Sequence, residues 1–258
     1  HDAMIEGFRL FAGCIRKGGM LIYRTGLPFE NSDAVSQTYS ATEFADVFAY
    51  DIRVEEHRYR FNINYSGQIV KDVTLSWPGR HNVENAVAAF SVAHSIGVDA
   101  DLIKDALFTF RGVKRRFEYK VDLPQVVYID DYAHHPAEID AVVRSVKEIY
   151  PGKKVLGIFQ PHLYSRTRDF ADGFARSLSA LDEIWLLDIY PAREQPLPGV
   201  NSTMIIDRME NKNARLVTMN EATDQVADTD SEVILTLGAG DIDKITDPIK
   251  QNLSKKYG

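Results

Sequence analysis

The sequence predicts an α/β protein in two parts, and the second part is expected to hold a mostly parallel sheet with helices on both faces. From Gly112 onward, five short apolar runs are each followed by a helical pattern. Repeated strand–helix units of this kind form parallel sheets. Before Gly112, one stretch alternates apolar and polar residues, which is typical of an antiparallel hairpin with one buried face. We therefore predict two regions, residues 1–111 and 112–258.

The first region is expected to contain a helix, a strand, a hairpin and two further helices, over residues 4–15, 20–23, 58–77, 82–96 and 101–110. Met4, Phe8 and Phe11 recur at helical spacing, and the pair Gly18-Gly19 is a stop signal. A Ser-Gly pair in the middle of the alternating stretch predicts the turn of the hairpin.

In the second region, the five strands are expected at residues 126–129, 154–159, 183–189, 215–219 and 232–237. The helix after the first strand has Pro136 just inside its start, where the fixed φ of proline is favourable. The helix after the second strand carries Phe170, Phe174, Leu178 and Leu181 at helical spacing, so we expect these four side chains to share one apolar face.

Composition limits the kinds of partner. The 258 residues are 45% hydrophobic and 26% charged, with a formal net charge of -7, which is typical of a globular protein and excludes nucleic-acid binding by bulk charge. An anionic ligand must therefore be held by local basic groups. Cys14 is the single cysteine, so an intrachain disulfide is excluded. No apolar run reaches the ~20 residues that cross a bilayer, so we expect no membrane partner.

Polar side chains gather directly after the first strand, in a segment that reads Asp-Asp-Tyr-Ala-His-His-Pro from residue 130 to residue 136. In an open parallel sheet, ligands bind at the carboxyl ends of the strands. Asp131 could accept hydrogen bonds from a ribose, and the imidazole of His134 could hold an anion or move a proton. The alternative is that the acids cap the next helix. The whole cluster at this position favours a functional site.

A second group follows the next strand, where His162, Tyr164, Arg166 and Arg168 lie at the expected start of a helix. A helix N-terminus with nearby guanidinium groups is a good site for a carboxylate or a phosphate. The alternative is that the two arginines are solvated surface charges. That alternative is stronger for Arg168, which is adjacent to Asp169.

Two further loops end strands of the same sheet. Residues 190–200 contain three prolines, which stiffen a loop that either shapes a pocket or serves packing. Gly238 and Gly240 follow the last strand and permit close approach of the backbone to a ligand. This short pattern is not the dinucleotide fingerprint, and nothing else in the sequence supports NAD.

Amide and basic side chains mark the first region and the boundary. Asn82 is well placed to cap a helix, or its amide could hydrogen-bond to the edge of an adenine. Basic residues at 114–116 could reach a nucleotide, or they form a solvated basic linker. Composition and motifs together indicate a small-molecule enzyme that handles a nucleotide and carboxylates.

Taken together, these segments resemble the Mur ligase family. The resemblance rests on GRHNVENAVAA, GVKRRFE, DDYAHHPAEI, FQPHLYSRTRDF, IYPAREQPLPGV and GAGDI, at residues 79–89, 112–118, 130–139, 159–170, 189–200 and 238–242. The two longest loop motifs are similar to those in the branch of the family that joins L-alanine to UDP-N-acetylmuramate. The branch that recycles a murein peptide is the alternative, and a non-catalytic nucleotide-binding remnant is a second one.

The resemblance implies a fold and a chemistry. Residues 1–111 would be the C-terminal portion of a central ATP-binding domain, and residues 112–258 a Rossmann-like C-terminal domain. The sequence starts within a helical pattern and contains no G-x-x-x-x-G-K-[ST] motif, so we expect a fragment that is inactive alone. The family's reaction uses ATP and Mg²⁺ to form an acyl phosphate, in cytoplasmic synthesis of peptidoglycan precursors for cell shape and division.

The resemblance also implies roles for individual residues. Catalytic roles fall to His134, His162, Arg166 and Arg168. Cofactor contacts fall to Asn82 and Asn85 at adenine, and to Arg116 and Asp131 on the ATP side, with Asp131 on the ribose. Substrate contacts fall to Tyr132, Tyr164, Gly238 and Gly240. The Mg²⁺ ligands are expected mainly in the absent part, so no metal ligand is predicted in residues 1–258.

Overall fold

The computed structural model describes residues 2–29, 33–210 and 213–258. The chain divides into two compact units, His1–Arg111 and Gly112–Gly258, each with a sheet of its own. The expected α/β class is confirmed. Within the described ranges, no helix combines the length and apolar character needed to cross a membrane.

The first unit contains a mixed sheet in the order β1-β2-β3-β4-β5. Its elements are α1 (Asp2–Gly13), β1 (Met20–Arg24), β2 (Val35–Ser40), β3 (Val47–Glu55), β4 (Arg58–Tyr65), β5 (Gln68–Leu75), α2 (Arg80–Ser95) and α3 (Ala100–Thr109). Strands β1 to β3 run parallel, and β3, β4 and β5 are antiparallel neighbours. The predicted hairpin is therefore confirmed as β4–β5, whereas strands β2 and β3 were not predicted.

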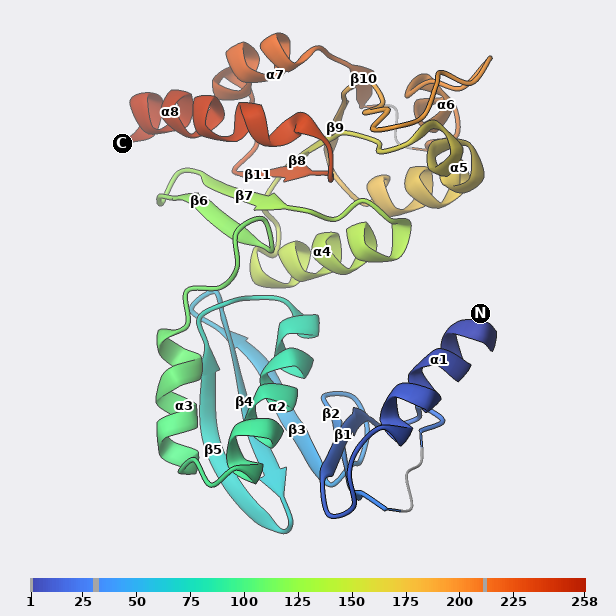
Figure 1. Cartoon of the computed structure of the whole chain (residues 1–258). Coiled ribbons are helices and arrows are strands. Elements are labelled where there is room, and N and C mark those ends of the chain that lie inside the picture. The colour runs from blue at the N-terminus through green and yellow to red at the C-terminus, as the bar shows by residue number, and fades with distance from the viewer. Residues whose placement is uncertain (1, 30–32, 211–212) are drawn as a thin grey trace. The chain divides into compact units, whose positions relative to one another are not determined.

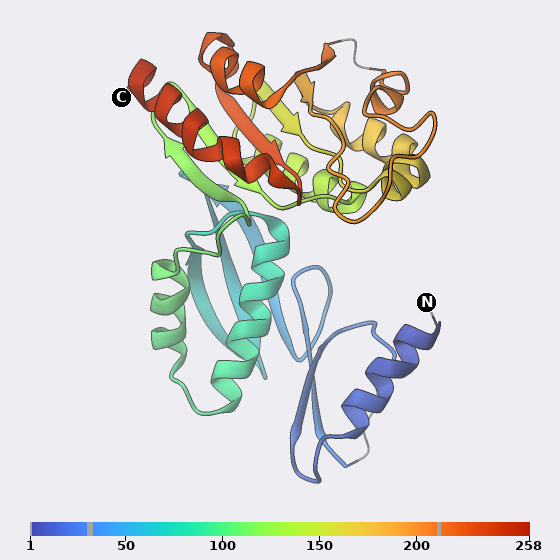
Figure 2. The same cartoon turned by 45° about the horizontal axis from the view of Figure 1, so that its top comes forward.

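The core of this unit lies between the sheet and α2. Tyr59, Phe61 and Ile63 alternate along β4 and are fully buried, as the period of two predicted. Val87 and Phe90 of α2 are buried as well. Helices α2 and α3 lie side by side over the sheet (Figures 1 and 2).

The second unit contains a sheet in the order β10-β9-β8-β11-β7-β6. Its elements are β6 (Glu118–Asp122), β7 (Val127–Asp131), α4 (Pro136–Ile149), β8 (Val155–Phe159), α5 (Tyr164–Leu178), β9 (Glu183–Leu186), α6 (Thr203–Ile206), β10 (Ala214–Leu216), α7 (Met219–Gln225), β11 (Val233–Leu237) and α8 (Thr246–Tyr257), with short 3₁₀ turns at Val226–Asp228 and Asp241–Ile245. All neighbouring strands are parallel except β6, which pairs antiparallel with β7 at the edge.

Helices cover both faces of this sheet, as expected. Figure 1 shows α4 and α5 on one face and α7 and α8 on the other. Tyr128, Ile234 and Trp185 of the strands pack with Ile249 and Leu253 of α8 in one buried cluster. The all-buried pattern of β7, β8 and β11 is what a parallel sheet covered on both faces requires.

Some expected boundaries were wrong. Strand β9 ends at Leu186, three residues before the expected end. Strand β10 ends at Leu216 because Thr218 begins α7 with a capping box, in which its hydroxyl and Glu221 exchange hydrogen bonds with backbone amides. Phe170 is 41% exposed instead of buried, because α5 has non-helical dihedral angles at this residue.

Candidate active site

The carboxyl ends of β7, β8, β9 and β11 bring four polar loops of the second unit to one edge of the sheet. His134 follows β7 and His162 follows β8, and their rings lie 6.0 Å apart. The ring of Tyr190, which follows β9, stacks on His162 at 5.6 Å. A parallel bridge between His162 and Tyr190 extends the pairing of β8 with β9. The sheet thus places the predicted residues His134 and His162 together, with Tyr190 as an unpredicted third ring.

Two buried nitrogen atoms at this edge have no hydrogen-bond partner within the described residues. They are Nδ1 of His162 and Nη1 of Arg166. Burial lowers the pKa of His162, and the nearby charges of Arg166 and His134 lower it further. His162 is therefore neutral near pH 7, with a lone pair on one ring nitrogen. Buried polar atoms are rarely left unpaired, so these two mark a place for an anionic or hydrogen-bonding ligand.

His134 is held in one orientation by its own loop. Its Nδ1 lies 2.9 Å from the carbonyl oxygen of Tyr132 and 3.3 Å from a carboxylate oxygen of Glu138. A carbonyl oxygen only accepts, so Nδ1 of His134 carries a proton in this arrangement. Glu138 also accepts the backbone amides of His134 and His135, which fixes the loop against the start of α4.

The start of α5 is not open for a ligand anion in the way we expected. The carboxylate of Glu194 accepts the backbone amide of Ser165 at 2.9 Å and the hydroxyl of the same serine. These two bonds lower the pKa of Glu194. Glu194 thus occupies the helix N-terminus and fixes the proline-rich loop to it. Tyr164 is the first residue of α5 and lies next to this contact.

Arg168 is an exposed surface charge, as the alternative interpretation predicted. Its Nε lies 2.8 Å from a carboxylate oxygen of Asp169, and its side chain is 54% exposed. The guanidinium group is thus paired with a neighbouring carboxylate at the surface. A catalytic role for Arg168 has no support in these contacts, and the assignment stays a prediction.

Asp130 and Asp131 belong to the end of β7, and their placement in a loop was wrong. Asp131 is 3% exposed. One of its carboxylate oxygens accepts the amide of Phe117 at 2.7 Å and the other accepts the amide of Ala133 at 2.7 Å. Burial raises its pKa to about 6, although the two amides lower it. Asp131 therefore holds two loops together here, and its contact with a ribose stays a prediction.

Arg116 lies over the ring of Tyr132, with 5.7 Å from its guanidinium carbon to the ring centroid. Arg115 lies over the same ring at 5.1 Å. The backbone amide of Tyr132 donates to the carbonyl oxygen of Arg115 at 2.8 Å. Arg116, which was predicted to contact the cofactor, thus lies over Tyr132, which was predicted to contact the substrate. Arg115, the preceding residue, lies over the same ring.

Gly238 and Gly240 pack against their own unit. A Cβ atom on Gly238 would lie 2.8 Å from the carbonyl oxygen of Gln160, and one on Gly240 would lie 2.6 Å from Cβ of Tyr190. Close packing therefore requires glycine at both positions, whether or not a ligand approaches them. Contact of their backbone with substrate stays a prediction.

Gln160 was not among the predicted site residues. Its side chain is 3% exposed, donates to Asp241 at 2.8 Å and accepts the amide of Ile242 at 2.9 Å. It thereby joins the loops after β8 and β11. Its position directly after a buried strand was the available signal.

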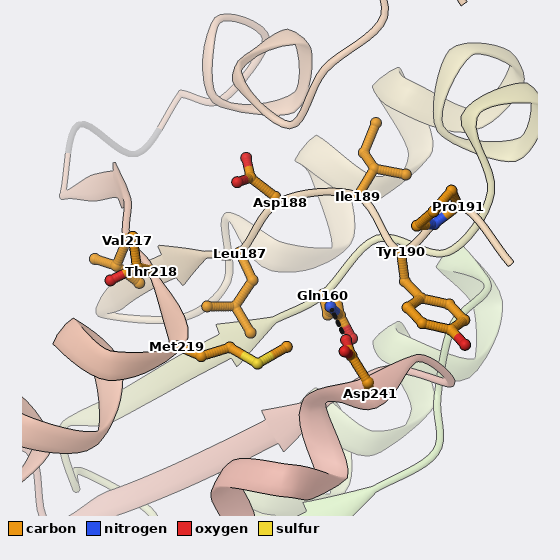
Figure 3. A pocket seen from close by; sticks show the side chains of 10 residues that line it. All are labelled: Gln160, Leu187, Asp188, Ile189, Tyr190, Pro191, Val217, Thr218, Met219 and Asp241. Carbon is orange, nitrogen blue, oxygen red and sulfur yellow. Dashed lines mark hydrogen bonds between the residues drawn. The ribbon is translucent and has the colours of Figure 1, made fainter. Parts of the chain in front are cut away.

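An open pocket of ≈ 340 Å³ lies beside Gln160 and Asp241, which both line it (Figure 3). Its volume is in the size range of small-ligand sites. Leu187 and Met219 point toward the pocket, and Tyr190, whose ring stacks on His162, lines it as well. Over the described ranges, no three His, Cys, Asp or Glu side chains are grouped to hold a metal ion.

Asn82 and Asn85 lie in the first unit, in the first two turns of α2. The helix begins at Arg80 after Gly79, so Asn82 is not the N-cap residue, as we had considered. Its side-chain amide donates to the carbonyl oxygen of Pro78 at 2.7 Å, and its oxygen accepts from Asn85 at 3.2 Å. The two amides form one pair on the helix, and their contact with adenine stays a prediction.

Comparisons with known proteins agree with this fold. The family model described as Mur ligase middle domain matches residues 19–93, and the one described as Mur ligase, glutamate ligase domain matches residues 115–240. The UDP-N-acetylmuramate–L-alanine ligase of Porphyromonas gingivalis is 49% identical over 96% of this chain and 56% of its own length. The ligase of the same name from Flavobacterium psychrophilum is 45% identical, over 99% of this chain and 56% of its own.

Among solved structures, the UDP-N-acetylmuramate-alanine ligase of Thermotoga maritima matches with a TM-score of 0.71 at 27% identity, over 85% of this chain and 48% of that chain. The chain therefore spans about half the length of the relatives it matches. The two family models and the identity to these ligases show that the chain belongs to the Mur ligase family.

Proposed function

We propose that this chain is part of a ligase that uses ATP and Mg²⁺ to join L-alanine to UDP-N-acetylmuramate in the cytoplasm, as a step of peptidoglycan precursor synthesis. The observation that carries the proposal is the pair of unpartnered buried nitrogens on His162 and Arg166, at the carboxyl edge of the sheet. The names and identities of the relatives support the choice of substrates.

The reaction has two steps. The γ-phosphoryl group of ATP is transferred to a carboxylate oxygen of the muramyl group, and ADP leaves. The amine of L-alanine then attacks the acyl carbon, loses a proton to a base, and expels phosphate as the carbon–oxygen bond breaks. Both steps pass through anionic groups, so positioned cations and hydrogen-bond donors provide most of the rate enhancement.

The second unit contains side chains that would bind the anion and side chains that would accept the proton. The free Nη1 of Arg166 would hold an anion, either the acyl phosphate or the carboxylate of alanine. His162, whose pKa is lowered by burial, would be neutral and able to accept the proton of the attacking amine. His134 would present Nε2 toward the same ligand, because Nδ1 is used by Tyr132.

Other residues would contact the nucleotide. We assign adenine contacts to Asn82 and Asn85, whose side-chain amides both donate and accept. In the second unit, we assign nucleotide contacts to Arg116, to Asp131 and to the ring of Tyr132. The guanidinium groups that lie over Tyr132 support this assignment, because they place positive charge beside a half-buried aromatic ring.

The test is an assay of ADP release in the protein that contains this chain, with UDP-N-acetylmuramate, Mg²⁺ and a choice of amine. We expect ADP release that depends on L-alanine. Release that requires a tripeptide instead would contradict the choice of L-alanine and favour the peptide-recycling branch. Nucleotide binding without turnover for either amine would favour a non-catalytic binding role.

The 258-residue chain is the matched control. Because its sequence contains no P-loop motif, we expect no ADP release from this chain alone under the same conditions. Alanine-dependent ADP release by the isolated chain would contradict the proposal that the phosphate-binding part lies elsewhere in the protein.

A further inference from the structure

A buried carboxylate outside the proposed set of site residues lies one residue before Asp131. Asp130 is 1% exposed and faces Thr236 of β11 across the sheet. One of its oxygens accepts the hydroxyl of Thr236 at 2.6 Å, and the other accepts Nε of Arg115 at 3.2 Å. The hydroxyl of Tyr128 lies 3.0 Å from that of Thr236, which extends the chain of hydrogen bonds into the core.

This carboxylate is costly for the fold. Burial raises the pKa of Asp130, and the hydroxyl of Thr236 and the positive charges of Arg115 and Lys120 offset only part of this rise. A buried ion pair contributes little net stability, and well-packed apolar residues in its place are often as stable. What such a pair does provide is a fixed geometry for the groups around it, so its contacts indicate what is being positioned.

Arg115 connects Asp130 to three other parts of the edge. Its Nη2 donates to the carbonyl oxygen of Gly238 at 2.6 Å. Its guanidinium carbon lies 5.1 Å from the ring centroid of Tyr132, and its carbonyl oxygen accepts the amide of Tyr132. Its own amide donates to Glu118 at 2.9 Å. One guanidinium group therefore ties the loops after β7 and β11 to the segment before β6.

The backbone of that segment is strained. Arg115 has φ of 57° and Phe117 has φ of 53°, both in the left-handed region that non-glycine residues avoid. Such conformations persist only where surrounding contacts fix them, and they cluster at functional sites. Here the contacts are those of Arg115 with Asp130 and of Phe117 with Asp131. Arg116 lies between the two strained residues, so its direction depends on both.

We propose that Asp130 is a positioning residue for nucleotide binding: through Arg115 it fixes the segment that carries Arg116 and the ring of Tyr132. The proposal rests on the proposed function, in which Arg116 and Tyr132 contact the nucleotide. Asp130 itself is buried and touches no ligand. Its effect is expected on nucleotide affinity, not on the chemical step.

The experiment compares Asp130→Asn with Glu232→Gln, which changes an acid to an amide at the opposite, amino end of β11. Amide hydrogen exchange of the 258-residue chain is measured at Phe117 and Tyr132. The KM for ATP and kcat are measured in the ligase that contains the chain. For Asp130→Asn we expect about tenfold faster exchange and about a tenfold higher KM for ATP with kcat unchanged, because a hydrogen bond to a charged group is lost. Glu232→Gln should change none of these values.

Thr236→Val is the second variant, since it keeps Asp130 and Arg115 and removes the hydrogen bonds of the hydroxyl to the carboxylate and to Tyr128. We expect faster amide exchange and a higher KM for ATP in this variant as well. It therefore tests the proposal even if Asp130→Asn does not fold. Unchanged exchange, or faster exchange with an unchanged KM for ATP, would overturn the positioning role. A wild-type ligase without any ATP dependence would instead overturn the proposed function, and the two failures are thus distinguishable.

Discussion

Ionisation of Asp131 should destabilise the second unit. Burial raises the pKa of this carboxyl group from 3.8 to about 6. Because the pKa of the folded state exceeds that of the unfolded state, the folded protein binds the proton more tightly. The stability that the proton confers is fully present below pH 3.8 and is lost as the pH rises through about 6. At ~1.4 kcal/mol per pKa unit, ionised Asp131 lowers the free energy of unfolding by about 3 kcal/mol.

The assay is urea unfolding of the chain, followed by tryptophan fluorescence from about pH 4 to about pH 8. The chain has two tryptophans, and Trp185 is 2% exposed in the core of the second unit. In a Trp77→Phe background, Trp185 reports on this unit alone. The comparison protein is Asp131→Asn, whose amide does not titrate and loses one of the two backbone bonds at every pH.

The difference in free energy of unfolding, wild type minus Asp131→Asn, should fall by about 2.4 kcal/mol across this range, because a small part of the effect is already lost at pH 4. A difference that stays constant or rises with pH would refute the reasoning, because it would mean that the bonds from Phe117 and Ala133 outweigh burial. Glu194→Gln is the control of opposite sign. Its carboxylate has a lowered pKa, so the stability it contributes is present at high pH and is lost as the pH falls.

Two further predictions concern the edge of the sheet. Gly240→Ala would place a methyl group 2.6 Å from Cβ of Tyr190 and against the side-chain oxygen of Gln160. It should lower the free energy of unfolding by about 1–3 kcal/mol in the same fluorescence assay. An unchanged urea midpoint would contradict the close packing at this position. Arg166→Ala should lower kcat/KM for L-alanine about 10- to 100-fold, since it removes a charged donor to an anion, whereas Arg168→Ala should change it about twofold or less. Equal effects of the two arginine variants would sink the distinction between them.

Much of the fold was predictable because one face of each element is buried. The alternation along β4 and the apolar runs of β7, β8 and β11 gave the strands, and Pro136 gave the start of α4. Strands β2, β3 and β6 were missed, and each of them buries at most two side chains. Strand β2 reads Val-Ser-Gln-Thr-Tyr-Ser and buries only Ser40, and β6 buries only Val121. Their pairing with neighbours, rather than any hydrophobic period, makes them strands.

The candidate site was predictable to a different degree. The carboxyl-edge rule brought His134 and His162 together correctly, because the sheet is parallel there. It could not show that Glu194, thirty residues along the chain, occupies the start of α5, or that Gln160 and Tyr190 fill the space beside Gly240. Those are contacts between loops, which depend on side-chain conformations that a local pattern does not encode.

The most direct measurement of the central claim follows an oxygen atom. UDP-N-acetylmuramate labelled with ¹⁸O in its muramyl carboxylate is incubated with ATP, Mg²⁺, L-alanine and the ligase that contains this chain, and the released phosphate is analysed by mass spectrometry. Ligation through an acyl phosphate predicts one labelled oxygen in phosphate for each amide bond formed. Unlabelled phosphate alongside amide formation would contradict the acyl-phosphate mechanism, and the absence of any L-alanine adduct would contradict the proposed reaction.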